Sequence, residues 1–453
     1  EEELPRGTKI VVHLREEQAE FAEKGRIETI LKNYSGFVAF PLTLGEDRIN
    51  TVEALWRKRK KDITDEEYTE FYKFASNAFD EPRYRMHFQA SEPIELNALL
   101  FVPEQNTEVF GFGQMEPGVS LYCKNVLIDD KPEGLLPEWL RFLRGVIDSA
   151  DIPLNISRES MQDSSLVQRI GGVVVKRFLK FLAAEAKDDA EKYDDFYAKF
   201  GRFLKEGVVT DFANREKAAE LLRFESSMLE KGEMTSFADY LTRAKDGQDK
   251  IYYLIGADRE TIESGPYLEA FKARGIEVIY FFDAVDEVLV QNLHEFDGKA
   301  LLAADSAAVE LDDDPSAEGE GDPLPDDDAN AVCEFLKEIG GENVDKVTIG
   351  KRLIGSPVAA LTPADGMNAQ MRAMMRAMNP DDAPPPVKVE LEINPRHELI
   401  KAIAENREEN TDRAKLVGAQ LIDNALLAAG LLEDRKDLIS RGFELMQAAL
   451  GKG

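Results

Sequence analysis

The hydrophobic pattern in the first third of the chain changes between strand-like and helix-like periods. Three short apolar runs are typical of strands: residues 37–44, 94–102 and 119–128. Thr64 precedes Glu67 by three residues, which is the spacing of a capping box, so we expect a helix to begin there and run toward Phe74. This mixture of strands and helices predicts an α/β layer.

From about residue 158 to residue 243, apolar positions recur with the helical period of 3.6 residues. They form two stripes, Leu166, Ile170, Val173, Val174, Phe178, Phe181 and Leu182, and then Phe196, Phe200, Phe203 and Leu204. Because a stripe of this kind buries one face of a helix, we predict a helical segment after the α/β layer.

A second α/β pattern follows. Residues 250–256 and 276–282 are apolar runs, and residues 258–274 between them have a helical pattern. This order predicts a βαβ unit with two parallel strands. Gly256-Ala257-Asp258 lacks the G-x-G-x-x-G with which dinucleotide-binding units approach a pyrophosphate. We therefore interpret the unit as structural and keep a small-molecule enzyme that uses it as an alternative.

An acidic stretch separates this unit from the last part of the chain. Residues 310–328 contain ten acidic residues, no basic residue and three prolines, which predicts a flexible linker. After it, residues 332–339 have a helical pattern, and residues 344–353 and 387–393 have strand-like patterns. A final α/β domain is expected, ending in helices over residues 398–450.

The apolar faces of the last helices are extensive for a hairpin to cover alone. We expect them to close a twofold dimer, with these interface residues: Leu421, Leu426, Leu427, Phe443, Met446 and Leu450. The alternative is that both helices pack on the preceding sheet of the same chain, and the sequence leaves this open.

Composition narrows the classes of function. The 453 residues carry 56 Lys and Arg against 87 Asp and Glu, a net charge of −31, which disfavours binding to nucleic acid or to anionic membranes. Two cysteines and four dispersed histidines give no disulfide framework and no metal site. The chain lacks an initiator Met and a cationic signal peptide, and residues 9–14 form a strand-like run with no nearby partner. We interpret it as a fragment of a longer protein.

One polar constellation lies where the first sheet meets the helical segment. Ser157 is a good N-cap, which puts Arg158 in a first helical turn, where the helix dipole disfavours a cation. Arg158 and Gln162, one turn apart, would present a guanidinium and an amide to the same point, which suits a phosphate. The alternative is a surface arginine paired with a nearby carboxylate.

A methionine stripe is the second constellation. Five of the eleven methionines follow helical spacing: Met367, Met371, Met374, Met375 and Met378. Methionine is flexible and polarizable, so an exposed stripe could adapt to many apolar partners. A core-facing helix is an equally good interpretation of the pattern.

Several segments, in order, resemble the ninety-kilodalton heat-shock chaperone family, known in bacteria as high-temperature protein G. They are RGTKI at residues 6–10, LPEWLRF at 136–142, GVIDS at 145–149, LNISRE at 154–159, IYYL at 251–254, EFDGK at 295–299 and EINPRH at 392–397. The resemblance covers nearly the whole chain. It identifies the middle and C-terminal domains of that family and the last strand of its amino-terminal ATPase domain.

The resemblance implies an ATP-dependent dimeric molecular chaperone, whose ATP and Mg²⁺ are bound mainly by a preceding domain outside this chain. Arg158 would match the middle-domain arginine that reaches the γ-phosphate, with Gln162 and Asn155 supporting its loop. The methionine stripe would match the client-binding helix, and the last helices the dimer interface. The chain alone is not expected to hydrolyse ATP, and a passive acidic scaffold is the alternative.

The resemblance also implies partners and a compartment. We expect unfolded or partly folded client proteins and a homodimer. The chain ends without the acidic pentapeptide that recruits helical-repeat cochaperones, so these are not expected. Val288 stands where some bacterial members carry a client-contacting tryptophan, which puts that contact in doubt. The bacterial cytoplasm is the expected location, with the mitochondrial matrix as the alternative.

The expected fold is multidomain, α/β and α+β. The divisions are the last ATPase-domain strand (1–15), a large α/β part (16–157), a helical segment (158–245), a small βαβ part (246–309), the acidic linker (310–330) and a C-terminal dimerisation and client-binding domain (331–453).

Overall fold

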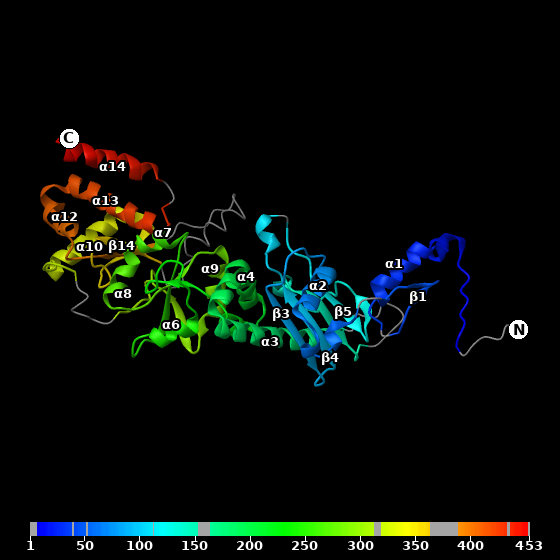
Figure 1. Ribbon diagram of the computed structural model, residues 1–453. Helices are drawn as coiled ribbons and strands as arrows, with labels where there is room; N and C mark the ends of the chain where they lie inside the picture. The colour runs from blue at the N-terminus through cyan, green and yellow to red at the C-terminus, as the bar shows by residue number, and fades with distance from the viewer. Residues whose placement is uncertain are drawn as a thin grey trace. The chain divides into compact units, whose positions relative to one another are not determined.

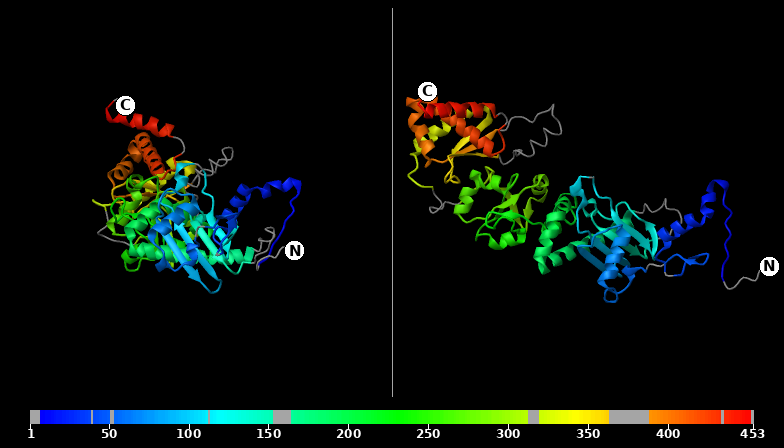
Figure 2. Two further views of the ribbon diagram at one scale, coloured as in Figure 1. Left: turned by 45° about the vertical axis from the view of Figure 1, so that its right-hand side comes forward. Right: turned by 45° about the horizontal axis from the view of Figure 1, so that its top comes forward.

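The computed structural model describes residues 7–38, 40–50, 53–111, 113–152, 164–311, 319–362, 388–432 and 435–451. The chain divides into two compact units, Glu1–Phe203 (unit 1) and Leu204–Gly453 (unit 2), each of which mixes helices and strands (Figures 1 and 2). The fold is therefore multidomain α/β and α+β, as the sequence predicts. Within the described residues, no helix is both long and apolar enough to span a membrane.

Unit 1 is built on a five-stranded sheet with the order β3-β4-β7-β5-β6. Its strands are β3 (Tyr84–Ala90), β4 (Leu96–Val102), β5 (Gly118–Cys123), β6 (Val126–Asp129) and β7 (Arg144–Ser149). Only the β5–β7 pair is parallel. The strand predicted over residues 94–102 is confirmed, but the run 119–128 is a hairpin of two strands that turns at Lys124 and Asn125, both with positive φ.

Alternation along β3 shows that both faces of this sheet are covered. His87 points to α2 (Asp65–Ser76), where its ring meets Tyr68, whereas Tyr84 packs on Phe181 and Phe196 on the opposite side. The second set belongs to α3 (Ser164–Asp188) and α4 (Ala190–Thr210), the predicted helical stripes. The capping box that begins α2 is confirmed.

Short elements precede the sheet. They are η1 (Glu16–Ala22), α1 (Lys24–Ser35), β1 (Thr43–Leu44), β2 (Asp47–Arg48), η2 (Leu55–Arg57) and η3 (Lys60–Asp62). The strand predicted over residues 37–44 is wrong except at its last two residues, because Phe37 instead packs edge-on against Trp56 in an aromatic core. Residues 9–14 pair with no strand among the described residues, and Ile10 is exposed.

A smaller sheet forms the first half of unit 2, with the order β11-β12-β9-β10-β8. Its strands are β8 (Glu225–Ser226), β9 (Lys250–Ile255), β10 (Ile279–Phe281), β11 (Glu295–Phe296) and β12 (Lys299–Ala303). β9 and β10 are parallel, which confirms the predicted βαβ unit. The crossover is two short helices, α7 (Arg259–Glu263) and α8 (Glu269–Ala273), joined by η7 (Pro266–Leu268). We call this sheet with its helices the βαβ layer.

Three further helices complete this half: α5 (Arg215–Ala219), α6 (Phe237–Arg243) and α9 (Ala284–Leu293). The second half has the sheet order β13-β15-β14, made of β13 (Val344–Ile349), β14 (Val358–Leu361) and β15 (Val389–Ile393). Its helices are α10 (Asp326–Gly340), α12 (Glu398–Glu409), α13 (Thr411–Ala428) and α14 (Lys436–Ala449). α10 begins inside the predicted linker, since three aspartates in its first turn favour a helix start.

Candidate functional site

The residues that the sequence singles out for chemistry lie outside the described part of the chain. Asn155, Arg158 and Gln162 fall within residues 153–163. The methionine stripe falls within residues 363–387: Met367, Met371, Met374, Met375 and Met378. The structure does describe the strand before residues 153–163, the helix after them, and the C-terminal helices.

The strand that leads into residues 153–163 is β7, and its most connected polar residue is Asp148. Asp148 is 1% exposed. Its Oδ2 accepts hydrogen bonds from Trp56 Nε1 (2.9 Å) and from the main-chain N–H of Asn125 (3.0 Å), and its Oδ1 accepts one from the main-chain N–H of Lys124 (2.9 Å). Three N–H donors replace the water that this carboxylate loses on burial. They tie β7 to η2 and to the β5–β6 turn.

The chain stays anchored beyond Asp148. Ser149 Oγ donates to the carbonyl oxygen of Glu95 (2.8 Å), and the main-chain N–H of Glu95 donates to Asp151 Oδ2 (2.9 Å). The thiol of Cys123 donates to the carbonyl oxygen of Ile152 (3.3 Å). Ser149, Asp151 and Ile152, three of the last four residues before residues 153–163, therefore each make a polar contact with β5 or with the residue just before β4.

The surroundings of Asp148 raise the pKa values of two neighbouring side chains, Tyr122 and Cys123. Burial, and then the nearby charge of Asp148, raise the pKa of Tyr122 to about 12. The same two causes, in the same order, raise the pKa of the Cys123 thiol. Both groups are protonated near neutral pH, so neither serves as a nucleophile or base there. The surroundings of Asp148 support a structural role and leave any phosphate chemistry to other side chains.

On the other side of residues 153–163, α3 is held by a close backbone contact. A Cβ added to Gly171 would lie 1.9 Å from the carbonyl oxygen of Leu135, whereas a Cβ added to Gly172 would meet no atom within 4 Å. Ile170, Val174 and Phe178 are fully buried on the same helix. The position of α3 against the 131–138 loop is thus set by the absence of one side chain.

A cavity of about 460 Å³ opens between this loop and β5. The cations that line it are already paired: Lys131 with Glu116, and Arg141 with Glu108, whose Oε1 is 2.7 Å from Arg141 Nε. Burial opposes ionisation of Glu108, but the hydrogen bonds and charge of Arg141 outweigh it and lower the pKa of Glu108. Because its cations are neutralised in this way, the cavity does not suit a phosphate.

The six residues predicted for a dimer interface separate into two groups. Leu421 and Leu426 lie in the hydrophobic core of the C-terminal half, 7% and 8% exposed. The other four are exposed on the same half: Leu427, Phe443, Met446 and Leu450. Ile439, which the sequence analysis did not include, continues the stripe on α14, and an ion pair between Arg441 and Asp423 holds α14 to α13. The interface prediction itself stays untested.

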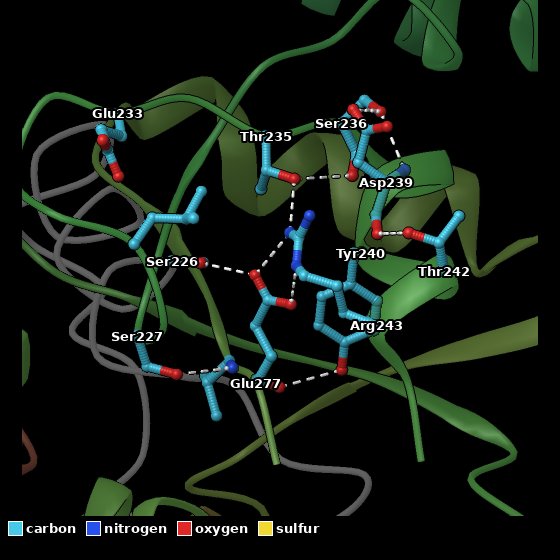
Figure 3. Close-up of polar contacts among 12 residues, drawn as sticks. Ser226, Ser227, Glu233, Thr235, Ser236, Asp239, Tyr240, Thr242, Arg243 and Glu277 are labelled. Carbon is cyan, nitrogen blue, oxygen red and sulfur yellow. Dashed lines mark hydrogen bonds and ion pairs between the residues drawn. The ribbon is translucent and has the colours of Figure 1, made fainter. Parts of the chain in front are cut away.

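The main polar network of the βαβ layer centres on Glu277 (Figure 3). Its carboxylate is 2.9 Å from Arg243 Nε, 2.8 Å from Arg243 Nη2 and 2.6 Å from the hydroxyl of Ser226, and Glu277 is 3% exposed. Nη2 also donates to the hydroxyl of Thr235, and Tyr240 donates to the Glu277 carbonyl oxygen (2.9 Å). The network joins α6 and β8 to the residues before β10.

Sequence reasoning missed both buried carboxylates, although a signal was present. Asp148 directly follows the apolar run Gly145-Val146-Ile147 within the same strand, and Glu277 stands within the apolar run 276–282. A lone charge in a strand-like run indicates a buried, hydrogen-bonded group, because an unpaired one would cost too much. In the part of the chain that the structure describes, no group of three or more His, Cys, Asp or Glu is placed to hold a metal ion.

Comparisons with known proteins cover almost the entire chain. The family model described as "Hsp90 protein" matches residues 43–452. Chaperone protein HtpG of Desulfitobacterium hafniense is 47% identical over 450 residues, covering 99% of this chain and 73% of that protein. TNF receptor-associated protein 1 homolog, mitochondrial, of Dictyostelium discoideum is 39% identical over 454 residues, 63% of its length. Heat shock protein 75 kDa, mitochondrial, of Bos taurus is 36% identical over 456 residues, 64% of its length.

Proposed function

Because this chain belongs to the Hsp90 protein family, we propose that it is the middle and C-terminal part of an ATP-dependent molecular chaperone. The observation that carries this proposal is the 47% identity to a bacterial HtpG chaperone along 99% of the chain. Its clients are unfolded or partly folded proteins, and the bacterial cytoplasm is its proposed location. Since mitochondrial relatives also match, the mitochondrial matrix is the alternative.

The catalytic part of the proposal concerns Arg158. ATP and Mg²⁺ would bind mainly in a preceding domain, and Arg158 would place its charge on the γ-phosphate during transfer, with Asn155 and Gln162 supporting it. The anchoring of β7 through Asp148, and of α3 through Gly171, supports this proposal, because an arginine that must reach a phosphate is best positioned when the chain before and after it is held in place.

The test is Arg158→Ala in a protein that joins this chain to its nucleotide-binding domain. We expect kcat for ATP hydrolysis to fall by about 10³-fold while nucleotide affinity stays nearly unchanged, since the lost contact forms in the transition state. Arg169→Ala, an exposed arginine on α3, is the matched control and should hydrolyse ATP at the normal rate. A normal rate for Arg158→Ala would remove this residue from the mechanism.

Client binding is proposed for the methionine stripe. Replacing both Met371 and Met375 with Asp should weaken suppression of aggregation of a model client, because charge opposes burial of apolar client surface. Circular dichroism and melting temperature should stay close to those of the unmodified chain. If the double variant instead loses its fold but suppresses aggregation normally per folded molecule, the stripe is core and the acidic scaffold gains support.

Dimerisation is proposed for the exposed stripe of α14. Phe443 is 60% exposed, and Met446 and Leu450 lie near it at helical spacing. Phe443→Asp should shift the mass measured by light scattering from dimer to monomer. Glu444→Lys, a larger charge change on the adjacent face of the same helix, should leave the dimer intact. Equal effects of the two substitutions would argue against the stripe.

A further inference from the structure

The loop between β13 and β14, residues 350–357, contacts the βαβ layer at several points, and we call it the coupling loop. The first contact is made by one carboxylate of the βαβ layer. Glu269, the first residue of α8, accepts at Oε2 the main-chain N–H groups of Ile354 (2.6 Å), Gly355 (2.8 Å) and Ser356 (3.2 Å). Its Oε1 also accepts the hydroxyl of Ser356. Three consecutive amides converging on one anion form a strong, geometrically specific contact.

The coupling loop also reaches toward the βαβ layer with its own arginine. The guanidinium of Arg352 donates to the carbonyl oxygens of Ser306 (3.0 Å) and Val309 (3.3 Å), in the chain that follows β12. Its Nε is 2.6 Å from Glu392 Oε2 on β15. A Cβ on Gly350 would lie 2.0 Å from the Glu392 side chain, so the loop approaches β15 at a glycine. One arginine therefore connects both halves of unit 2.

Apolar packing continues across the same boundary. Leu353, Ala359 and Leu361 share one buried cluster with Tyr252 and Phe271 of the βαβ layer. Tyr267 donates to the carbonyl oxygen of Ala360 on β14 (2.7 Å). α8 and β14 are both labelled in Figure 1. These contacts join segments about 90 residues apart and bypass the acidic stretch 310–328 that connects them along the chain.

We propose that the coupling loop makes the βαβ layer and the C-terminal sheet one cooperative body, and that the Glu269 carboxylate is the group whose release separates them. A movement imposed on the C-terminal sheet would then reach the βαβ layer through the loop, not through the acidic stretch. A negative charge placed on the loop beside Glu269 would uncouple the two. The inference depends on neither ATP hydrolysis nor client binding.

The experiment measures a distance across the boundary in the whole chain. Both native cysteines are buried and free, so spin labels attach selectively to exposed Glu295→Cys on β11 and Glu334→Cys on α10. Double electron–electron resonance should give a narrow distribution of distances between the two labels in the otherwise unmodified chain. The same is expected for Glu260→Ala, an exposed control on α7. Glu269→Ala should broaden it, and added acetate should narrow it again by filling the empty anion site.

Hydrogen exchange gives a second readout. In Glu269→Ala, the amides of residues 354–356 should exchange at least about tenfold faster, the loss expected from bonds to a charged acceptor. A distribution as narrow as in the parent would overturn the proposal, because the apolar cluster alone would then hold the halves together. Broadening that acetate fails to reverse would overturn it as well, since the substitution would be acting through packing.

A second pair of variants decides the matter if Glu269→Ala does not fold. Ser356→Asp keeps Glu269 and adds a like charge beside it, so it should broaden the distribution by repulsion. Ser356→Asn has the same size without the charge and should stay narrow. Equal distributions for these two variants would contradict the assignment of Glu269 as the releasing group.

Discussion

Two buried carboxylates, Asp148 in unit 1 and Glu277 in unit 2, are satisfied in different ways. Asp148 is held by an indole and two main-chain N–H groups. Glu277 is held by the hydroxyl of Ser226 and by two nitrogens of Arg243, whose side chain remains 34% exposed. The first network is closed within the protein, whereas the second has one arm that reaches the surface.

The two networks are therefore sensitive to the loss of different groups. Two donors of Asp148, the indole N–H of Trp56 and the main-chain N–H of Asn125, make buried hydrogen bonds, so they have no route to water when the carboxylate is removed. Arg243 can rotate into solvent when Glu277 is removed, but Glu277 cannot follow when Arg243 is removed. In unit 1 we therefore expect a large loss of stability whichever partner is removed. In unit 2 we expect a smaller loss, whose size depends on which partner is removed.

The largest effect is expected for Asp148→Ala. It leaves the buried N–H groups of Trp56 and Asn125 without acceptors, and also removes the part-buried bond from Lys124, which should lower the free energy of unfolding of unit 1 by about 3–5 kcal/mol. Both tryptophans, Trp56 and Trp139, lie in unit 1, so urea unfolding followed by tryptophan fluorescence reports on this unit. Asp151→Ala, which removes one exposed contact, should cost about 1 kcal/mol or less. Similar losses of unfolding free energy for the two variants would show that the donors to Asp148 contribute little to the stability of unit 1.

Arg243→Ala is expected to cost less, about 2–3 kcal/mol, because the pair is partly exposed. Glu277→Gln should cost about 1–2 kcal/mol, since Arg243 then turns to water. Far-UV circular dichroism during urea unfolding should show both losses, while the tryptophan transition of unit 1 stays in place. A larger loss for Glu277→Gln than for Arg243→Ala would refute the predicted asymmetry.

Two adjacent glycines on α3, Gly171 and Gly172, have different surroundings in unit 1. Gly171→Ala should destabilise unit 1 by about 1–3 kcal/mol, because the new methyl group would overlap the carbonyl oxygen of Leu135. Gly172→Ala meets open space and should instead stabilise the helix by about 0.5–1 kcal/mol. Opposite shifts of the tryptophan transition are the expected result. A gain in stability for both variants would show that the 131–138 loop moves easily to accommodate the methyl group at position 171.

The smallest effect concerns pH and His87. Tyr68 donates to its Nδ1 (2.7 Å) and its Nε2 faces the carbonyl oxygen of Trp56 (3.1 Å), an arrangement that fits a neutral ring with its proton on Nε2. Burial lowers the pKa of His87 below 6.5. The unfolded chain therefore binds the proton first, and the free energy of unfolding falls as pH falls below 6.5, by at most about 1.4 kcal/mol per pH unit for one proton.

The measurement is the urea midpoint of tryptophan fluorescence at pH 7.5 and at pH 5.5. His87→Gln keeps a polar side chain without the titration, so its midpoint should change less between the two pH values than that of the unmodified chain. The other histidines are present in both proteins and cancel. An unchanged pH dependence in His87→Gln would assign the effect to other groups.

Several elements followed from short-range pattern alone. Thr64 and Glu67 form the predicted capping box, and the apolar runs around residues 250 and 280 are the parallel strands β9 and β10. The strand predicted over residues 37–44 was wrong because Phe37 packs against Trp56 and does not belong to a sheet. The single strand predicted over residues 119–128 was wrong because the chain turns at Lys124 and Asn125. This turn contains no glycine that would have marked it in the sequence, and Asp148 accepts hydrogen bonds from its two amides.

Residue order alone was enough to identify the family, the α/β class and the start of α2, because these depend on local pattern and on contacts within about four positions. It also assigned a role to Arg158, which stays a prediction. Long-range contacts were needed to show that Leu421 is core while Phe443 is exposed, and that Glu269 binds amides 85 to 87 residues away. Partners so distant along the chain leave no periodic signal, since folding alone brings them together.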